Sequence, residues 1–287
     1  MADQGNPLVR SKAALPGYVF RTLQVLRTET LTPSMRRITL GGPEIAGFGQ
    51  DRTGPNVKIY LPLPGQDRPV MPVVGQDGVA RWPPDDQRPT MRTYTVRHFD
   101  EEAQELQLDF VLHEPGGVAS DWARNAVPGD HLGITGPGGR TVKDADWYLI
   151  VGDEAALPAI TIIAEKLPAD AHGIILIEVA DTTERLPITA PPGVAVHWLY
   201  RKGTPAGRTT LLTDAVHTTT IPDDREVFAW VSAESATVRT LRGYLRDEIG
   251  LSRTAMLTIG YWKVGMPETT YSAMYDNDRE SDHHSHN

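Results

Sequence analysis

The first half of the chain alternates short apolar segments with turns that contain glycine or proline. The segments are rich in β-branched and aromatic side chains, which is typical of β-strands. They span residues 19–26, 35–40, 56–61, 92–95, 106–113 and 131–135. Short strands spaced in this way predict a small antiparallel β-barrel. Residues 71–89 contain several prolines and little periodicity, so we expect a loop there, before the strand that carries Arg92.

Side-chain alternation assigns two faces to the strand predicted at 106–113. One face carries Leu106, Leu108, Phe110 and Leu112, which we expect in the barrel core. The opposite face carries Gln107, Asp109, Val111 and His113. We expect this second face to look toward a bound ligand.

From about residue 143 the pattern changes to strands that alternate with helices. Continuous apolar runs predict buried parallel strands at 147–151, 174–179, 194–199, 227–231 and 255–261. Helical spacing predicts helices at 157–167 and 235–249, the second with Ser235 as its N-cap. Such alternation predicts a doubly wound parallel sheet, whose ligands bind beyond the carboxyl ends of its strands.

The expected fold class is therefore a two-domain β plus α/β chain. Residues 18–143 form the predicted barrel domain and 144–265 the predicted α/β domain. Residues 1–17 have too few apolar side chains to pack, and we expect a flexible arm. Residues 266–287 form a C-terminal extension that begins with a candidate helix and ends in a polar segment with three histidines, for which we expect a solvated, disordered tail rather than a metal site.

Composition narrows the classes of function. The 287 residues carry a net charge of −9, which argues against nucleic acid as a partner. The absence of cysteine excludes disulfides, thiolate-bound zinc and ordinary iron–sulfur clusters. The sequence contains no apolar run long enough to span a bilayer and no apolar core of a signal peptide near Met1. We expect a cytoplasmic monomer.

Two neighbouring features predict a site for a diphosphate. Arg92 lies on a predicted strand, and a guanidinium binds phosphate oxygens in a bidentate manner. Gly116 and Gly117 open a predicted helix, whose first backbone N–H groups and positive dipole end attract the same anion. Tyr94 shares a strand face with Arg92 and offers a ring to a flat ligand, whereas Thr95 faces the other way and needs a bend or its backbone N–H to take part. Together they predict a bound dinucleotide.

Six segments in order resemble one known family. They are Arg-x-Tyr-Thr at 92–95, Asp-Phe-Val-Leu-His at 109–113, Val-Ala-Ser-Asp-Trp-Ala at 118–123, Gly-Pro-Gly-Gly at 136–139, the run 147–160 with Gly152-Asp153-Glu154, and Gly-Tyr-Trp-Lys at 260–263. The chain resembles the siderophore-interacting proteins, FAD-dependent ferric-siderophore reductases of the ferredoxin-reductase-like superfamily, over about residues 20–265. One departure is Val118, where the family usually has a proline.

The resemblance implies a relay from a nicotinamide nucleotide (NADH or NADPH) through FAD to ferric iron in an organic chelate. A hydride carries two electrons and Fe(III) accepts one, so a flavin is needed between them. No residue need act as a general acid or base, and the chelate leaves no need for a protein iron ligand. The implied flavin contacts are Arg92, Tyr94, Thr95, Asp109, Val111 and His113, with Gly117, Ala119 and Ser120 at the phosphates. The implied nucleotide contacts are Gly152, Asp153, Ala156 and Glu234.

Two lysines are the expected contacts of an anionic ferric siderophore. Lys58 lies on a predicted barrel strand, and Lys263 follows a predicted strand end. A flexible ammonium can serve chelates of different shape. For the nucleotide, Asp181 follows a predicted strand and favours NADH, because a carboxylate accepts from a ribose 2′-OH and repels a 2′-phosphate. Arg185, Arg201 and Lys202 would reverse this preference if they converged there.

Simpler interpretations remain open for each feature. An isolated strand arginine more often pairs with a surface carboxylate, and Gly152-Asp153-Glu154 lacks the Gly-x-Gly-x-x-Gly fingerprint of a dinucleotide site. Tyr261 and Trp262 are compatible with core positions. Two other functions also fit: a flavoprotein that reduces a protein acceptor, and a siderophore-binding protein without activity. The first would respond to a haem or iron–sulfur partner, and the second would purify colourless.

Overall fold

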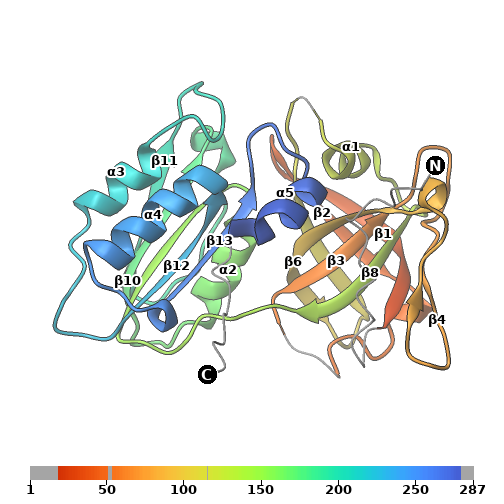
Figure 1. Cartoon of the computed structure of the whole chain (residues 1–287), viewed down its shortest axis with the longest axis horizontal. Helices are drawn as coiled ribbons and strands as arrows, with labels where there is room; N and C mark the ends of the chain where they lie inside the picture. The colour runs from red at the N-terminus through yellow and green to blue at the C-terminus, as the bar shows by residue number, and fades with distance from the viewer. Residues whose placement is uncertain (1–18, 51–53, 115, 279–287) are drawn as a thin grey trace, which may run out of the picture. The chain divides into compact units, whose positions relative to one another are not determined.

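The computed structural model describes residues 19–50, 54–114 and 116–278 (Figure 1). A closed barrel forms from six strands in the order β1-β2-β7-β6-β3-β8. The pairs β1–β8, β3–β6, β3–β8 and β6–β7 are antiparallel. The strands are β1 (Phe20–Thr32), β2 (Met35–Gly41), β3 (Asn56–Leu61), β6 (Thr90–Asp100), β7 (Glu105–Val111) and β8 (His131–Gly138). The predicted antiparallel barrel is confirmed.

The barrel core follows the alternation of side chains along its strands. On β7, Leu106, Leu108 and Phe110 are fully buried, as predicted. The prediction for the end of this strand was wrong, because β7 ends at Val111. Leu112 lies beyond it, half-buried, and donates its backbone N–H to Ser34 O at 2.8 Å. The strand therefore ends two residues earlier than the apolar pattern indicated.

The predicted loop at 71–89 holds a small hairpin that the sequence did not reveal. It consists of β4 (Val73–Val74) and β5 (Ala80–Arg81), followed by the 3-10 turn η2 (Asp85–Gln87). Trp82 then packs edge-on against Phe20 and lies 5.6 Å from the ring of Tyr60. Two-residue strands are too short to produce a period, so only the irregular character of this segment was predictable. The barrel also carries η1 (Pro43–Ile45) and helix α1 (Val118–Asn125).

Five parallel strands form the second sheet, in the order β11-β10-β9-β12-β13. They are β9 (Trp147–Asp153), β10 (His172–Val179), β11 (Gly193–Tyr200), β12 (Val227–Glu234) and β13 (Met256–Trp262). The chain builds outward from β9 through β10 to β11, then returns to the other side of β9 for β12 and β13. The order therefore reverses between β9 and β12, and ligands of such sheets bind outside the carboxyl ends at this point.

Helices cover both faces of this sheet (Figure 1). The helices are α2 (Leu157–Lys166), α3 (Leu211–Thr218), α4 (Ser235–Asp247) and α5 (Glu268–Tyr275), with 3-10 turns η3 (Thr182–Glu184), η4 (Arg253–Ala255) and η5 (Asp276–Asp278). Ile150 packs with α2 on one face, whereas Leu149 and Val151 pack with α3 and α4 on the other. The predicted doubly wound sheet is confirmed. Helix α3 was not predicted, because its eight residues show no clear helical period.

One predicted cap was wrong. The N-cap of α4 is Glu234, whose side chain accepts from Ala236 N at 2.5 Å. Ser235 is the first helical residue, and its hydroxyl donates to Asp278 Oδ2 at 2.5 Å. A glutamate seldom caps a helix, since its longer side chain must fold back. Here it can do so because β12 ends at this residue and α4 follows without a loop.

The described residues form two compact units. The first contains 19–28, 38–108 and 116–139, without the undescribed 51–53; the second contains 29–37, 109–114 and 140–278. Met35, at the tip of the β1–β2 hairpin, is buried in the core of the second unit with Tyr148 and Ile150. Helix α5 confirms the candidate helix of the C-terminal extension. The predicted arm 1–17 and the histidines of the tail lie outside the described residues, within which no helix has the length and apolarity needed to cross a bilayer.

Candidate functional site

Arg92 lies on β6 opposite Ile59 of β3. Its guanidinium is half-buried and donates from Nη1 to the carbonyl of Met91 at 2.8 Å. Helix α1 contacts β3, the neighbour of β6 in the barrel. The strand that bears the arginine and the helix that bears the glycine turn are thus next to the same strand.

The start of α1 is a candidate anion site. Gly117 is its N-cap and, as a glycine, has no side chain with which to cap the helix. The first backbone N–H groups of a helix have no partner within the helix itself. Ala119 and Ser120 are buried, so the first turn is anchored. A Cβ on Gly116 would lie 1.8 Å from Asp121 Oδ1, so glycine there lets the Asp121 carboxylate fold against the turn.

These residues fit the diphosphate and ring of a flavin nucleotide. The helix start offers N–H donors, and Arg92 supplies the cation that must offset Asp121. Tyr94 is half-buried on β6, opposite Val57. Thr95 is buried, and its hydroxyl lies 3.5 Å from Asn56 Oδ1. The register of β6 with β3 is regular through Thr95, so only the backbone of this residue is available for the predicted contact.

The three predicted flavin contacts near the end of β7 have different environments. Asp109 is buried, and both of its oxygens accept from Arg37, from Nε at 2.7 Å and from Nη2 at 2.8 Å. Its carboxylate is thus already neutralised. Val111 is half-buried against the apolar core of the second unit. His113 lies beyond the strand end and is exposed.

Gly152 sets how closely α2 approaches the sheet. A Cβ at this position would lie 2.6 Å from the Cβ of Ala156, 2.8 Å from Ser232 O and 2.9 Å from Ile160 Cδ1. No larger residue fits without a shift of α2 or β12. Ala156 is the N-cap of α2 and is fully buried. Three of the predicted nucleotide contacts, Gly152, Asp153 and Ala156, therefore lie together at the switch point of the sheet.

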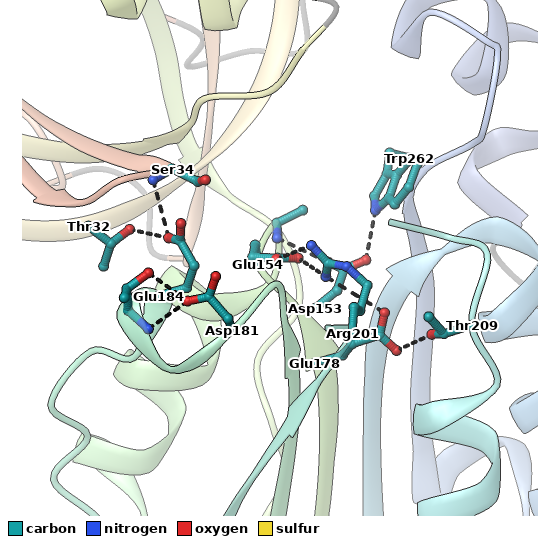
Figure 2. A network of polar contacts seen from close by, with 12 residues as sticks. Thr32, Ser34, Asp153, Glu154, Glu178, Asp181, Glu184, Arg201, Thr209 and Trp262 are labelled. Atoms are coloured by element: carbon teal, nitrogen blue, oxygen red, sulfur yellow. Dashed lines mark hydrogen bonds and ion pairs between the residues drawn. The ribbon is translucent and has the colours of Figure 1, made fainter. Parts of the chain in front are cut away.

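A network of charged side chains lies at this edge (Figure 2). Arg201 follows β11 and donates to both oxygens of Glu154, at 2.5 and 2.7 Å. Its Nη1 also lies 3.7 Å from Glu178 Oε1, and the other oxygen of Glu178 accepts from Thr209 Oγ1 at 2.7 Å. Asp153 accepts from the indole Nε1 of Trp262 at 2.7 Å and from Ala155 N at 3.0 Å.

Two of these carboxylates, Glu154 and Glu178, therefore share one guanidinium, and the charge of Glu154 also acts on Asp153. Burial, and then the charge of Glu154, raises the pKa of Asp153 to about 7, although the hydrogen bond from Trp262 opposes the rise. Burial also raises the pKa of Glu178. Arg201 is committed to these acids, with 8% of its side chain exposed. The edge is anionic, and this arginine does not extend toward solvent to meet a phosphate.

Glu234 and Ser232 complete the edge on β12. Glu234 Oε2 caps α4, and Oε1 accepts from Val264 N at 3.1 Å. Its carboxylate thus joins the start of α4 to the segment after β13. Ser232 is fully buried, and its hydroxyl finds no partner among the residues that the structure describes.

A second carboxylate site lies at the end of β10 (Figure 2). Asp181 is exposed, and its Oδ1 accepts from Thr183 N at 2.8 Å and from Thr183 Oγ1 at 2.6 Å. Glu184 is buried and accepts from Thr32 Oγ1 at 2.5 Å and from Ser34 N at 3.2 Å. Glu184 therefore binds the tip of the β1–β2 hairpin, whereas Asp181 keeps an oxygen directed to solvent.

The two predicted substrate lysines lie in different units. Lys58 on β3 is half-buried and donates to Thr93 Oγ1 at 2.5 Å. Lys263 lies 3.5 Å from Ser235 Oγ, and its ammonium is 5.3 Å from the ring centre of Tyr275. The contact of Lys58 is thus with a hydroxyl, and those of Lys263 are with a hydroxyl and an aromatic ring.

Two family models cover most of the chain. The one described as siderophore-interacting FAD-binding domain matches residues 24–141, and the one described as siderophore-interacting protein matches 145–265. The ferric vibriobactin reductase ViuB of Vibrio cholerae is 34% identical over 254 residues, which cover 88% of this chain and 92% of that protein. The chain belongs to the siderophore-interacting protein family.

Two further similar proteins agree with this assignment. The NADPH-dependent ferric-chelate reductase of Escherichia coli is 34% identical, with coverage of 77% of this chain and 85% of that protein. The crystal structure of the siderophore-interacting protein SipS from Aeromonas hydrophila is 35% identical and superposes with a TM-score of 0.78, over 90% of this chain and 96% of that one.

Sequence reasoning missed the partners of several residues in this family member. It treated Trp262 as a core aromatic and Arg201 as a candidate phosphate ligand, yet each binds a buried acid. A charged residue directly after an apolar strand, as Arg201 is, signals an ion pair at the sheet edge. Which acid pairs with Arg201 was not predictable, since Glu154 is 47 residues away in the sequence.

Proposed function

We propose that the protein is an FAD-dependent ferric-siderophore reductase that takes its electrons from a nicotinamide nucleotide. The observation that carries this proposal is the glycine N-cap of α1, a helix that contacts β3, together with Arg92 and Tyr94 on the paired strand β6. Relatives named as a ferric vibriobactin reductase and a ferric-chelate reductase support the reaction class.

Arg92 and the first turn of α1 would hold the diphosphate of FAD. Arg92 contributes a charge-assisted contact, and Gly117, Ala119 and Ser120 contribute the helix start. Tyr94 would pack against the flavin ring and Thr95 would donate its backbone N–H, while Asp109, Val111 and His113 remain proposed contacts. When bound, FAD supplies the conversion of a two-electron hydride transfer into single-electron transfers to iron.

The residues of the α/β unit would position the nucleotide rather than transfer protons. Gly152 and Ala156 keep the β9–α2 turn tight at the switch point of the sheet, where dinucleotides bind in this fold. Asp153 and Glu234 fix their neighbours through hydrogen bonds. Since reduction of ferric iron requires no proton transfer from the protein, none of these residues is assigned as a general acid or base.

The charge distribution favours NADH over NADPH. Asp181 offers an exposed carboxylate beyond β10, which suits a ribose 2′-OH and repels a 2′-phosphate. Arg201, the cation that would have favoured NADPH, is neutralised by Glu154 and Glu178. The E. coli relative is named as NADPH-dependent, so the two proteins should be compared directly. We expect a higher kcat/KM with NADH here, and expect Asp181→Ala to narrow the difference; a higher value with NADPH in the parent contradicts the preference.

The substrate would be an anionic ferric siderophore. The chelator already fills the coordination sphere of the iron, so the protein need only bind the complex. The net charge of −9 repels an anion at long range, and local ammonium groups must offset this repulsion. Lys58, on β3, and Lys263, after β13, are the proposed contacts, because a flexible ammonium can bind chelates of different shape.

The deciding experiment is a visible spectrum of the purified protein, followed by NADH or NADPH without oxygen and then by a ferric chelate. A flavin spectrum that bleaches with the nucleotide and returns with the chelate supports the proposal. A colourless protein that binds the chelate without nucleotide oxidation contradicts it and favours a binding protein. Reoxidation by a haem or iron–sulfur protein alone would favour a flavoprotein with a protein acceptor.

A further inference from the structure

Trp262 reaches across the carboxyl end of a neighbouring strand. It is the last residue of β13, yet its indole Nε1 donates to Asp153 at the end of β9 (Figure 2). In the sheet, β12 lies between β9 and β13. The indole must therefore cross the end of β12, beside the point where the strand order reverses.

The outer edge of the same indole is held by a glycine. A Cβ on Gly207 would lie 2.9 Å from Trp262 Cη2 and 2.8 Å from Val264 Cγ2. Gly207 has a φ of +70°, which glycine adopts without strain. The loop between β11 and α3 can thus approach the ring closely. The indole is fixed at both ends, by Asp153 and by this loop, and it remains half-buried.

We propose that Trp262 is a wall of the nicotinamide-nucleotide site and that Asp153 is the positioning residue that holds it in place. The proposal rests on the proposed function, since it names a further contact of the same nucleotide. A fixed aromatic surface at the switch point suits a flat heteroaromatic ring, because such rings gain from stacking or edge contacts beyond buried area. Asp153 acts only through Trp262, so it sets nucleotide affinity without touching the reacting atoms.

The hold on the indole depends on pH. Both oxygens of Asp153 already accept hydrogen bonds, one from Trp262 and one from Ala155. A proton on either oxygen makes that oxygen a poor acceptor, so a charge-assisted bond becomes a neutral one. Because burial raises the pKa of Asp153 to about 7, this change falls near neutrality. The hydrogen bond that positions the indole of Trp262 is therefore stronger above that pH and weaker below it.

The charged groups around Asp153 come from every neighbouring strand. Glu154 follows β9, Glu178 lies on β10 and Arg201 follows β11, and the arginine is paired with both glutamates. Glu234 ends β12, with both oxygens occupied by backbone N–H groups. Lys263, after Trp262, has its ammonium beside Ser235 and Tyr275. Among these neighbours the acids outnumber the cations, which favours a protonated carboxyl.

The first test reads the indole directly in the holoenzyme. The six tryptophans give six indole N–H resonances in a proton–nitrogen correlation spectrum, and Trp262→Phe identifies the one of interest. We expect this resonance to shift between pH 5.5 and 8.5 with a midpoint near 7, and to lose the shift in Asp153→Asn. Trp198→Phe, which removes a half-buried indole on β11, is the matched control and leaves the Trp262 signal unchanged.

The second test reads the nucleotide. In the parent, the KM for NADH should rise about five-fold as pH falls from 8 to 6, the ratio expected when a charge-assisted bond becomes neutral, while kcat changes little. Trp262→Phe and Asp153→Asn should show the raised KM at all pH values, with flavin content unchanged. The Kd for NAD⁺, measured by calorimetry without turnover, should differ between the parent and the variants in the same direction as the KM.

The outcomes separate the two proposals. If the parent neither binds NAD⁺ nor oxidises NADH or NADPH, the proposed function fails. If the parent does so, but the two variants keep the KM and pH profile of the parent, the role of Trp262 and Asp153 is overturned alone. A Trp262 resonance that does not move with pH in the parent also overturns the hold by Asp153.

Discussion

The start of α1 in the barrel unit and the start of α2 in the α/β unit are both candidate positions for a diphosphate, and they differ in charge. At α1, one carboxylate, Asp121, lies against Gly116, and Arg92 lies on a nearby strand. At α2, the helix follows Asp153 and Glu154, and of the three acids at this edge Glu154 and Glu178 share Arg201. The N-cap residues, Gly117 in α1 and Ala156 in α2, make no side-chain cap bond.

If both sites bind as proposed, this difference predicts how long each ligand stays. A helix start with a guanidinium on a nearby strand stabilises an anion, which suits a cofactor that remains bound. An edge crowded with acids should bind a dinucleotide phosphate weakly, which suits a co-substrate that must leave after each turnover. We therefore propose that the same helix-start geometry serves two kinds of binding, and that the charged side chains decide which.

The largest effect is expected from Arg201→Ala, which removes the cation of the acidic edge. Glu154 and Glu178 would be left buried without a cation, and a buried pair broken in this way costs about 3–5 kcal/mol. Urea unfolding at pH 8 should show a loss of this size in the free energy of unfolding. Arg27→Ala is the control, because the pair of Arg27 with Glu105 is exposed and such pairs contribute about 0–1 kcal/mol.

The loss should shrink in acid. Burial raises the pKa of Glu178 above its unfolded value, so its charged form costs stability, and this cost appears as pH rises through that window. Without Arg201 the pKa of Glu178 should rise further, since an opposite charge has been removed. At pH 5 the variant can protonate Glu178 and recover part of its stability. An equal deficit at pH 5 and pH 8 would mean that the acids are not the cause.

The next effect concerns the basic site. Arg92→Ala removes a charge-assisted phosphate contact of about 1.5–3 kcal/mol, or roughly ten- to a hundred-fold in FAD affinity. Flavin fluorescence during titration of the flavin-free protein measures this. Arg27→Ala loses the same charge elsewhere on the barrel and should keep the affinity of the parent. Unchanged FAD affinity in Arg92→Ala would remove the basis for treating α1 as the permanent site.

Gly152→Ala tests whether the close packing of α2 against the sheet is needed at the second site. The added methyl would meet Ser232 O at 2.8 Å and the Cβ of Ala156 at 2.6 Å, so α2 must move away from β12. Overpacking of this kind costs about 1–3 kcal/mol. Thermal unfolding should show the loss, and the KM for the nucleotide should rise. Gly243→Ala on α4 has only a distant contact, at 4.0 Å from Asp247 Oδ2, and should be neutral or stabilising. Equal melting temperatures for the two variants would contradict the packing role.

The strands were predictable because their side chains repeat with a local period. The buried run of β9 and the alternation of Leu106, Leu108 and Phe110 are visible in the sequence and reappear in the structure. The hairpin of β4 and β5 was not, since two-residue strands have no period. Helix α3 was not predicted for a similar reason, because only Leu212 and Val216 of its eight residues are buried.

The chemistry of the candidate site was predictable by residue type but not by partner. Arg92, Gly117 and Gly152 lie where a strand end or helix start was expected. The partners of Asp153, Asp109 and Arg201 are between 23 and 109 residues away, and no local pattern identifies them. Sequence reasoning therefore located the acidic edge without its hydrogen bonds, and so missed the link between Asp153 and Trp262.

The smallest effect is expected from the two lysines, which test whether local cations offset the negative charge of the protein. Lys58→Ala and Lys263→Ala should each raise the KM for an anionic ferric catecholate about two- to five-fold, the range of a partly exposed ion pair of up to about 1 kcal/mol. Flavin content and nucleotide-to-flavin reduction should stay near the values of the parent, because neither lysine is proposed to contact FAD or the nucleotide.

Salt provides the control for this last effect. At high ionic strength the attraction is already screened in the parent, so the difference between parent and variant should shrink. A neutral ferric hydroxamate should show little dependence on either lysine at any salt concentration. Lys166→Ala, at the end of α2, removes the same charge at a position that is exposed and far along the helix from its start, and should leave the KM unchanged. If the double variant of Lys58 and Lys263 reduces ferric catecholates as well as the parent at low salt, the substrate binds elsewhere.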